Sequence, residues 1–90
     1  MSIYKIDEIS AALASTDDDK EIEAFLNSLL TEKEIADISS RWELVKLLDQ
    51  GMSQRNIAKE LGLSLCKITR GSRELKKKGS PFKHFIDKVK

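Results

Sequence analysis

The chain has 90 residues, which is the length of one small domain and too short for two. Hydrophobic residues make up 40% and charged residues 34%, a balance that excludes both a disordered chain and a membrane-embedded one. No apolar run approaches the roughly 20 residues of a membrane-spanning helix, and the first residues do not resemble a secretory signal. Cys66 is the single cysteine and cannot form an internal disulfide, which fits a reducing compartment. We therefore expect a cytoplasmic protein without a membrane partner.

The formal net charge of +1 conceals two halves of opposite charge. Residues 1–40 hold three lysines against ten acidic residues, a net charge of −7, whereas residues 41–90 hold 13 basic against five acidic residues, a net charge of +8. A swing of this size favours an anionic partner for the second half, nucleic acid above all. Two solvated helical surfaces that pair with each other would give the same pattern, so charge alone leaves both interpretations open.

The predicted elements are all helices, because helix-forming residues dominate and nothing has the pattern of a strand. Apolar residues at three- and four-residue spacing predict a first amphipathic helix near residues 3–13 and a second one near residues 19–30. Thr31 and Glu34 form a capping box that opens a third helix, which should stop at Gly51.

Three more helices follow towards the C-terminus. Ser53 is the expected N-cap of a fourth helix that runs to Leu61, and Ser64 of a fifth that runs to about Lys78. Pro81 suits the first turn of a last short helix. The predicted fold class is therefore all-α, with about six short helices.

Residues 54–70 have the spacing of a helix-turn-helix. Ala58 is small where two helices would cross, and Gly62 stands at the turn, where a positive φ favours glycine. Apolar side chains at the remaining packing positions join the two helices into one core, namely Ile57, Leu61, Leu63 and Ile68. An ordinary helical hairpin is the alternative.

The second helix of such a unit enters the major groove, and its first residues face the base edges. These positions hold Ser64, Leu65, Cys66 and, one turn later, Thr69. Leu65 and Cys66 can touch thymine methyl groups, although Cys66 fits equally well as a small buried filler. Arg55, at the start of the preceding helix, can reach a guanine or a phosphate.

Residues 53–78 carry eight basic and two acidic side chains, a net charge of +6. Lys67, Lys76, Lys77 and Lys78 suit phosphate contacts, while the last three also suit the negative end of a helix dipole. The full set of predicted DNA-contacting residues is Gln54, Arg55, Ser64, Leu65, Cys66, Lys67, Thr69, Arg73 and Lys76.

Gly71 breaks the pattern, because a third apolar contact is expected three residues after Ile68. Glycine in mid-helix costs about 1 kcal/mol relative to alanine. The missing side chain leaves a slot beside the cation of Arg70. The slot fits either a pocket for a small anionic or zwitterionic ligand or close helix packing.

The stretch Ile68-Thr-Arg-Gly-Ser-x-x-Leu-Lys, preceded by Met52-Ser-Gln-Arg, resembles the Trp repressor family, a type example of the helix-turn-helix. The resemblance runs from about Leu30 to Lys78. It implies an intertwined homodimer that binds double-stranded DNA at a palindromic operator. Within a single domain over residues 1–90 it implies three parts: dimerisation helices (1–50), a DNA-reading head (53–78) and a C-terminal helix (81–90).

The resemblance also implies a small effector between core and reading head, with L-tryptophan the first candidate, and no other cofactor and no metal. By position, Arg41 and Arg70 match the two arginines that sandwich the indole ring in the family. The arginine that Arg70 matches also binds the ligand carboxylate. Gly71 matches the glycine that makes room. Leu30 and Thr31 match residues at the pocket mouth that the partner subunit contributes.

This sequence departs from the tryptophan-responsive members at the pocket. Glu74 stands in place of a serine that helps to bind the ligand's amino group. Glutamate can pair with an ammonium, or it can form a salt bridge with Arg70 or Arg41 and close the pocket. Lys67 replaces a threonine and Arg73 an asparagine.

We therefore predict a sequence-specific DNA-binding transcriptional regulator, a repressor controlled by a small effector such as L-tryptophan. An effector-independent regulator, and a helical interaction module whose basic half binds an acidic partner, are the alternatives. An enzyme is not expected. His84 lacks a Cys or His partner at metal-ligand spacing, and Asp17–Asp19 lack the pattern of a calcium loop.

Overall fold

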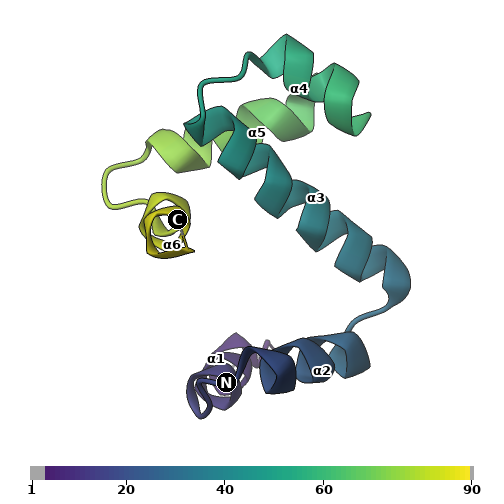
Figure 1. The fold of residues 1–90 in the computed structure, drawn as a ribbon, viewed down its shortest axis with the longest axis vertical. Coiled ribbons are helices and arrows are strands. Elements are labelled where there is room, and N and C mark those ends of the chain that lie inside the picture. Colours follow the sequence, from purple (N-terminus) through teal and green to yellow (C-terminus); the bar gives the residue numbers. More distant parts are fainter. Residues whose placement is uncertain (1–3, 90) are drawn as a thin grey trace. The chain divides into compact units, whose positions relative to one another are not determined.

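The computed structural model describes residues 4–89, which form helices and no strand (Figure 1). This confirms the all-helical prediction. The chain consists of two compact units, with the boundary between Ile35 and Ala36. No helix in the described range is long and apolar enough to cross a membrane. Residues 4–89 contain six helices: α1 (Ile6–Ala14), α2 (Asp19–Leu29), α3 (Glu32–Asp49), α4 (Gln54–Leu61), α5 (Leu65–Lys76) and α6 (Pro81–Val89).

The N-terminal unit contains α1, α2 and the start of α3. Helix α1 begins at Ile6, while Ile3 of the predicted helix lies outside the described residues. Asp18 caps α2, because its Oδ1 accepts a hydrogen bond from the Lys20 N–H at 2.9 Å. Neither α1 nor α2 contains a buried residue, and the side chain of Leu29 is 50% exposed. The apolar stripes of these two helices are therefore partly exposed.

Helix α3 begins at the predicted capping box. The Thr31 N–H donates to Glu34 Oε1 at 2.8 Å, and the Glu34 N–H donates to Thr31 Oγ1 at 3.1 Å. The backbone hydrogen bond from Thr31, followed by its side-chain bond, holds the pKa of Glu34 below its usual value. The helix ends at Asp49, and Gly51 follows with a φ of +94°. Both ends of this helix were thus predictable from local chemistry.

Helices α4 and α5 pack together as a helix-turn-helix at the C-terminal half of α3 (Figure 1). Ser53 and Ser64 cap them, because each Oγ accepts from the N–H three residues later at 3.2 and 3.3 Å. Gly62 makes the turn with a φ of +65°. The core of the unit consists of fully buried Leu44, Ile57 and Ile68, with Leu47, Leu48, Met52, Ala58, Leu61 and Leu63 packed around them.

Helix α5 ends at Lys76, two residues before the predicted end near Lys78. Lys77 already has an extended backbone with a ψ of 141°. The chain must turn back here to place α6, and Pro81 disfavours a helical conformation at the residue before it. The predicted reading head over residues 53–78 therefore ends in a short turn.

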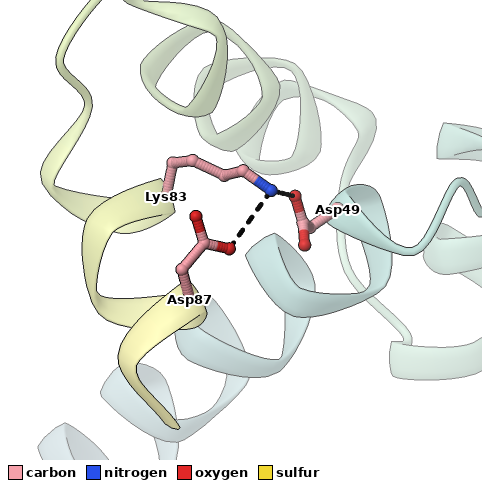
Figure 2. A network of polar contacts seen from close by, with 3 residues as sticks. All are labelled: Asp49, Lys83 and Asp87. Atoms are coloured by element: carbon pink, nitrogen blue, oxygen red, sulfur yellow. Dashed lines mark hydrogen bonds and ion pairs between the residues drawn. The ribbon is translucent and has the colours of Figure 1, made fainter. Parts of the chain in front are cut away.

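Helix α6 is fixed to the end of α3 by three charged side chains (Figure 2). Lys83 Nζ lies 2.8 Å from Asp49 Oδ1 and 3.3 Å from Asp87 Oδ1, and the Asp49 side chain is only 10% exposed. These two hydrogen bonds raise the pKa of Lys83. The bond to Asp49 has the larger effect and the bond to Asp87 the smaller. Ile86 is buried on the same helix. Charge and apolar contact together hold α6 in place.

Candidate nucleic-acid interface and neighbouring cavity

The first turns of α5 present an exposed face of mixed apolar and polar character. The Leu65 side chain is 56% exposed, and Cys66 and Thr69 are exposed beside it. The alternative in which Cys66 fills the core is wrong, because the thiol lies at the surface. A shallow hollow of about 350 Å³ runs over this face and is lined by Leu65, Cys66, Thr69, Arg70 and Arg73. The fold therefore brings together several of the residues predicted to contact DNA.

A hydrogen bond links this face to the start of α4. Thr69 Oγ1 donates to Gln54 Oε1 at 3.2 Å, although the two residues are 15 positions apart in the sequence. The sequence gives no signal for this contact, because it depends on how α4 and α5 cross. The bond joins two of the predicted DNA-contacting side chains across the contact between α4 and α5.

Most of the predicted basic contacts have no partner within the described chain. Arg55, Lys67, Arg73 and Lys76 are exposed and make no hydrogen bond or ion pair with another residue of the range 4–89. Lys77 differs, because it is paired with Glu74. Cations without a protein partner can bind phosphates without first breaking an ion pair. The surface around α5 therefore carries exposed positive charges that a polyanion can bind.

A cavity of about 470 Å³ opens on an adjoining side of α5, between α5, α3 and α6, and shares Arg70 with the hollow. Gly71 lies in its wall, and a Cβ built there would be 3.0 Å from Leu44 Cδ2. The glycine therefore allows close packing of α5 on α3 and also leaves open space beside Arg70. The cavity is lined by Arg41, Leu44, Val45, Lys67, Arg70, Gly71, Glu74 and Phe82.

Four of the six predicted effector residues line this one cavity: Arg41, Arg70, Gly71 and Glu74. The other two, Leu30 and Thr31, belong to the N-terminal unit, so their contribution stays a prediction. Lys67 was predicted as a phosphate contact, whereas the structure also places it in the cavity wall. Its position three residues before Arg70 on a helix was the available signal, since such residues share a face. No group of three or more potential metal-ligating side chains is found among the described residues.

Glu74 is bonded away from the two arginines. Its Oε1 lies 2.9 Å from Lys77 Nζ, and no ion pair joins it to Arg70 or Arg41. The alternative in which such an ion pair closes the cavity is therefore wrong. The hydrogen bond from Lys77 lowers the pKa of Glu74, desolvation opposes this effect, and the charges of Lys77, Arg70 and Arg73 add to the lowering. The Glu74 side chain is thus a carboxylate at neutral pH.

Residues 4–90 match the sequence model of a family described as Trp repressor protein. The chain belongs to this family. The match extends well beyond the motif between Leu30 and Lys78 and includes the N-terminal helices and α6. It therefore covers the helix-turn-helix, the cavity and the exposed apolar stripes together.

Several curated proteins, each named Trp operon repressor homolog, are similar to the chain. The protein of Chlamydia trachomatis serovar L2 is 39% identical over 71 residues, covering 73% of this chain and 76% of the relative. That of Xylella fastidiosa strain M23 is 38% identical over 64 residues and covers 70% of each. That of Vibrio campbellii is 36% identical over 84 residues, covering 92% of this chain and 81% of the relative. No solved structure has a significant match to the chain.

Proposed function

We propose that this protein is a DNA-binding transcriptional repressor that acts as a homodimer on a palindromic operator. The observation that carries the proposal is the exposed face of α5 in a chain of the Trp repressor family. Leu65, Cys66 and Thr69 are presented there on a helix whose other side is fixed by the buried Ile68. The relatives named Trp operon repressor homolog support the same function.

In this proposal the N-terminal turns of α5 enter the major groove. Thr69 offers a hydroxyl and Leu65 an apolar surface to base edges, while Arg55 and Lys67 contact phosphates. Two copies read adjacent major grooves only if their α5 helices lie about 34–36 Å apart, one turn of DNA. A small change in the tilt of α5 therefore changes the affinity for the operator strongly.

The cavity behind α5 is the proposed site of control. A ligand in the cavity contacts both α3 and α5, so it can favour one angle between these two helices. It raises DNA affinity only if it binds the DNA-competent arrangement more tightly than the other one. L-tryptophan, which the family resemblance implies, is the first effector to test.

The test starts with selection of bound sequences from random double-stranded DNA, with and without L-tryptophan. We expect the selected sequences to share a palindromic consensus. We also expect log Kd to rise linearly with the logarithm of the salt concentration, with a slope of about 0.9 for each phosphate contacted. Equal binding to DNA of any sequence and to polyglutamate would instead support the interaction module. L-tryptophan without effect on the selected site would exclude it as effector and leave the repressor proposal intact.

Base reading is tested by Thr69→Ala. We expect discrimination between the selected operator and a scrambled one to fall by about 1–3 kcal/mol, or roughly 5- to 150-fold, measured by fluorescence anisotropy. Lys59 is an exposed lysine on α4, outside the exposed face of α5. The variant Lys59→Ala is therefore the matched control and should leave discrimination unchanged. Unchanged discrimination in Thr69→Ala would contradict its role at the bases.

A further inference from the structure

Three of the side chains that line the cavity behind α5 are cations without a partner. Arg41, Lys67 and Arg70 all border the space of about 470 Å³. None of them makes a hydrogen bond or ion pair with another residue in the described range. All three are also exposed, so their charges lie at the mouth of the cavity and remain accessible.

Among the described residues, Glu74 is the one acidic side chain in the lining, and it is paired with a lysine. Glu74 is bonded to Lys77 at 2.9 Å, and Lys77 is not itself part of the cavity wall. Because this hydrogen bond lowers the pKa of Glu74, the pair consists of one carboxylate and one ammonium at neutral pH. The lining therefore carries three cations against one carboxylate, and that carboxylate is paired with Lys77.

The remaining lining is apolar. Leu44 and Val45 are 2% and 1% exposed and form the floor, while the half-buried ring of Phe82 comes from α6. Gly71 adds no side chain to the space. A floor of this kind suits a hydrocarbon or aromatic body, and the volume is in the range of small-molecule sites.

We propose that the cavity binds an apolar or aromatic small molecule with two negative charges, a dicarboxylate or a phosphate monoester, in preference to a zwitterionic amino acid. One anionic group pairs with Arg70 and the second with Lys67, while Arg41 adds positive charge at the mouth. An amino acid would bring its ammonium group next to three cations and find the one carboxylate already bonded to Lys77. This inference rests on the proposed function, since it names the ligand class of the control site.

The test uses the purified full-length chain without DNA and four probes in isothermal titration calorimetry at pH 7.5. Phthalate and phenyl phosphate are aromatic dianions, benzoate is a matched monoanion, and L-tryptophan is the zwitterion. We expect each dianion to bind about tenfold or more tightly than benzoate and L-tryptophan. Binding of L-tryptophan as tight as that of the dianions, or no preference for the second charge, would overturn the proposal.

Two variants locate the charges. Lys67→Ala should remove most of the preference for phthalate over benzoate, whereas Lys59→Ala on α4 should leave it unchanged. If Lys67→Ala weakens DNA binding but leaves the phthalate preference intact, Lys67 serves only the DNA backbone and the proposal fails. Glu74→Gln should strengthen phthalate binding. A loss of L-tryptophan binding in that variant would show that Glu74 holds an ammonium, which contradicts the proposal.

Operator binding measured without any probe separates the two levels of inference. A chain that binds a selected operator but shows no preference for dianions keeps the repressor function and loses the ligand class. A chain that prefers dianions but selects no DNA sequence keeps the cavity assignment and loses the regulatory function. Circular dichroism of each variant verifies that the helices are intact.

Discussion

At the scale of single residues, Gly71 determines how closely α5 approaches α3. A Cβ at this position would lie 3.0 Å from Leu44 Cδ2 and 3.7 Å from Val45 Cγ1. The φ of Gly71 is negative, unlike that of the turn glycine Gly62, so space and not backbone conformation requires the glycine. The residue was recognisable in the sequence as an anomaly, but the neighbour that it accommodates depends on the helix crossing.

Gly71→Ala is expected to separate stability from ligand binding. Alanine favours the helix by about 1 kcal/mol, while its Cβ forces the Leu44 side chain to move by a few tenths of an ångström. Since Leu44 lines the cavity, we expect the melting temperature to change by only a few degrees and phthalate affinity to fall about tenfold or more. Thermal melts and calorimetry measure the two effects. Lys76→Ala on the same helix, outside the cavity, is the control, and equal ligand affinity in both variants would contradict the role of Gly71.

The charged residues show where prediction from sequence ends. Glu74 has Arg70 four positions before it and Lys77 three positions after it, and both spacings allow an ion pair on a helix. The sequence cannot choose between them, because the choice depends on small differences in side-chain position; the structure gives Lys77. The bond between Lys83 and Asp49, 34 positions apart, had no sequence signal at all.

At the scale of elements, helix starts were more predictable than contacts between helices. A cap is a local arrangement of a few residues, so Ser53, Ser64 and the box at Thr31 could be identified from spacing alone. The end of α5 was less certain, because the position of the turn after Lys76 depends on where α6 docks. The position of α6 in turn depends on Ile86, whose burial arises only from tertiary packing.

The capping box of α3 predicts a pH dependence. Since the pKa of Glu34 is lowered in the folded chain, its contribution to stability is complete above the usual glutamate pKa and is lost as pH falls through the lowered value. In Glu34→Gln the amide can still accept the Thr31 N–H but carries no charge. We expect wild type to melt slightly above the variant at pH 7, by a small margin because the carboxylate is exposed, and the margin to shrink as pH falls below the usual glutamate pKa.

Thermal melts from pH 3 to pH 7 test this expectation. Glu8→Gln in the first turn of α1, which changes the same charge without a resolved cap hydrogen bond, is the control. A margin between wild type and Glu34→Gln that grows as pH falls would contradict the assignment.

At the scale of the whole molecule, the division of charge follows the division of tasks that we propose. The net charge of −7 lies in residues 1–40, which include all of α1 and α2, and the reading face lies entirely in the basic half. Ile6 and Leu29 in the N-terminal helices are 68% and 50% exposed, so these helices leave apolar surface uncovered. A chain of 90 residues has little core of its own, and a second copy is the partner that the family resemblance implies.

Leu29→Glu tests this proposal, because it places a charge on the exposed apolar stripe of α2. We expect wild type to sediment with about twice the chain mass of 10.2 kDa and the variant to sediment as a monomer. Because a monomer loses the gain from binding both half-sites at once, its operator affinity should fall by about a hundredfold. Asn27→Glu adds the same charge at an exposed polar position of the same helix and should stay dimeric. If Leu29→Glu also stays dimeric, the uncovered stripe is not the dimer surface, and a different face of the chain must bring the two reading helices together.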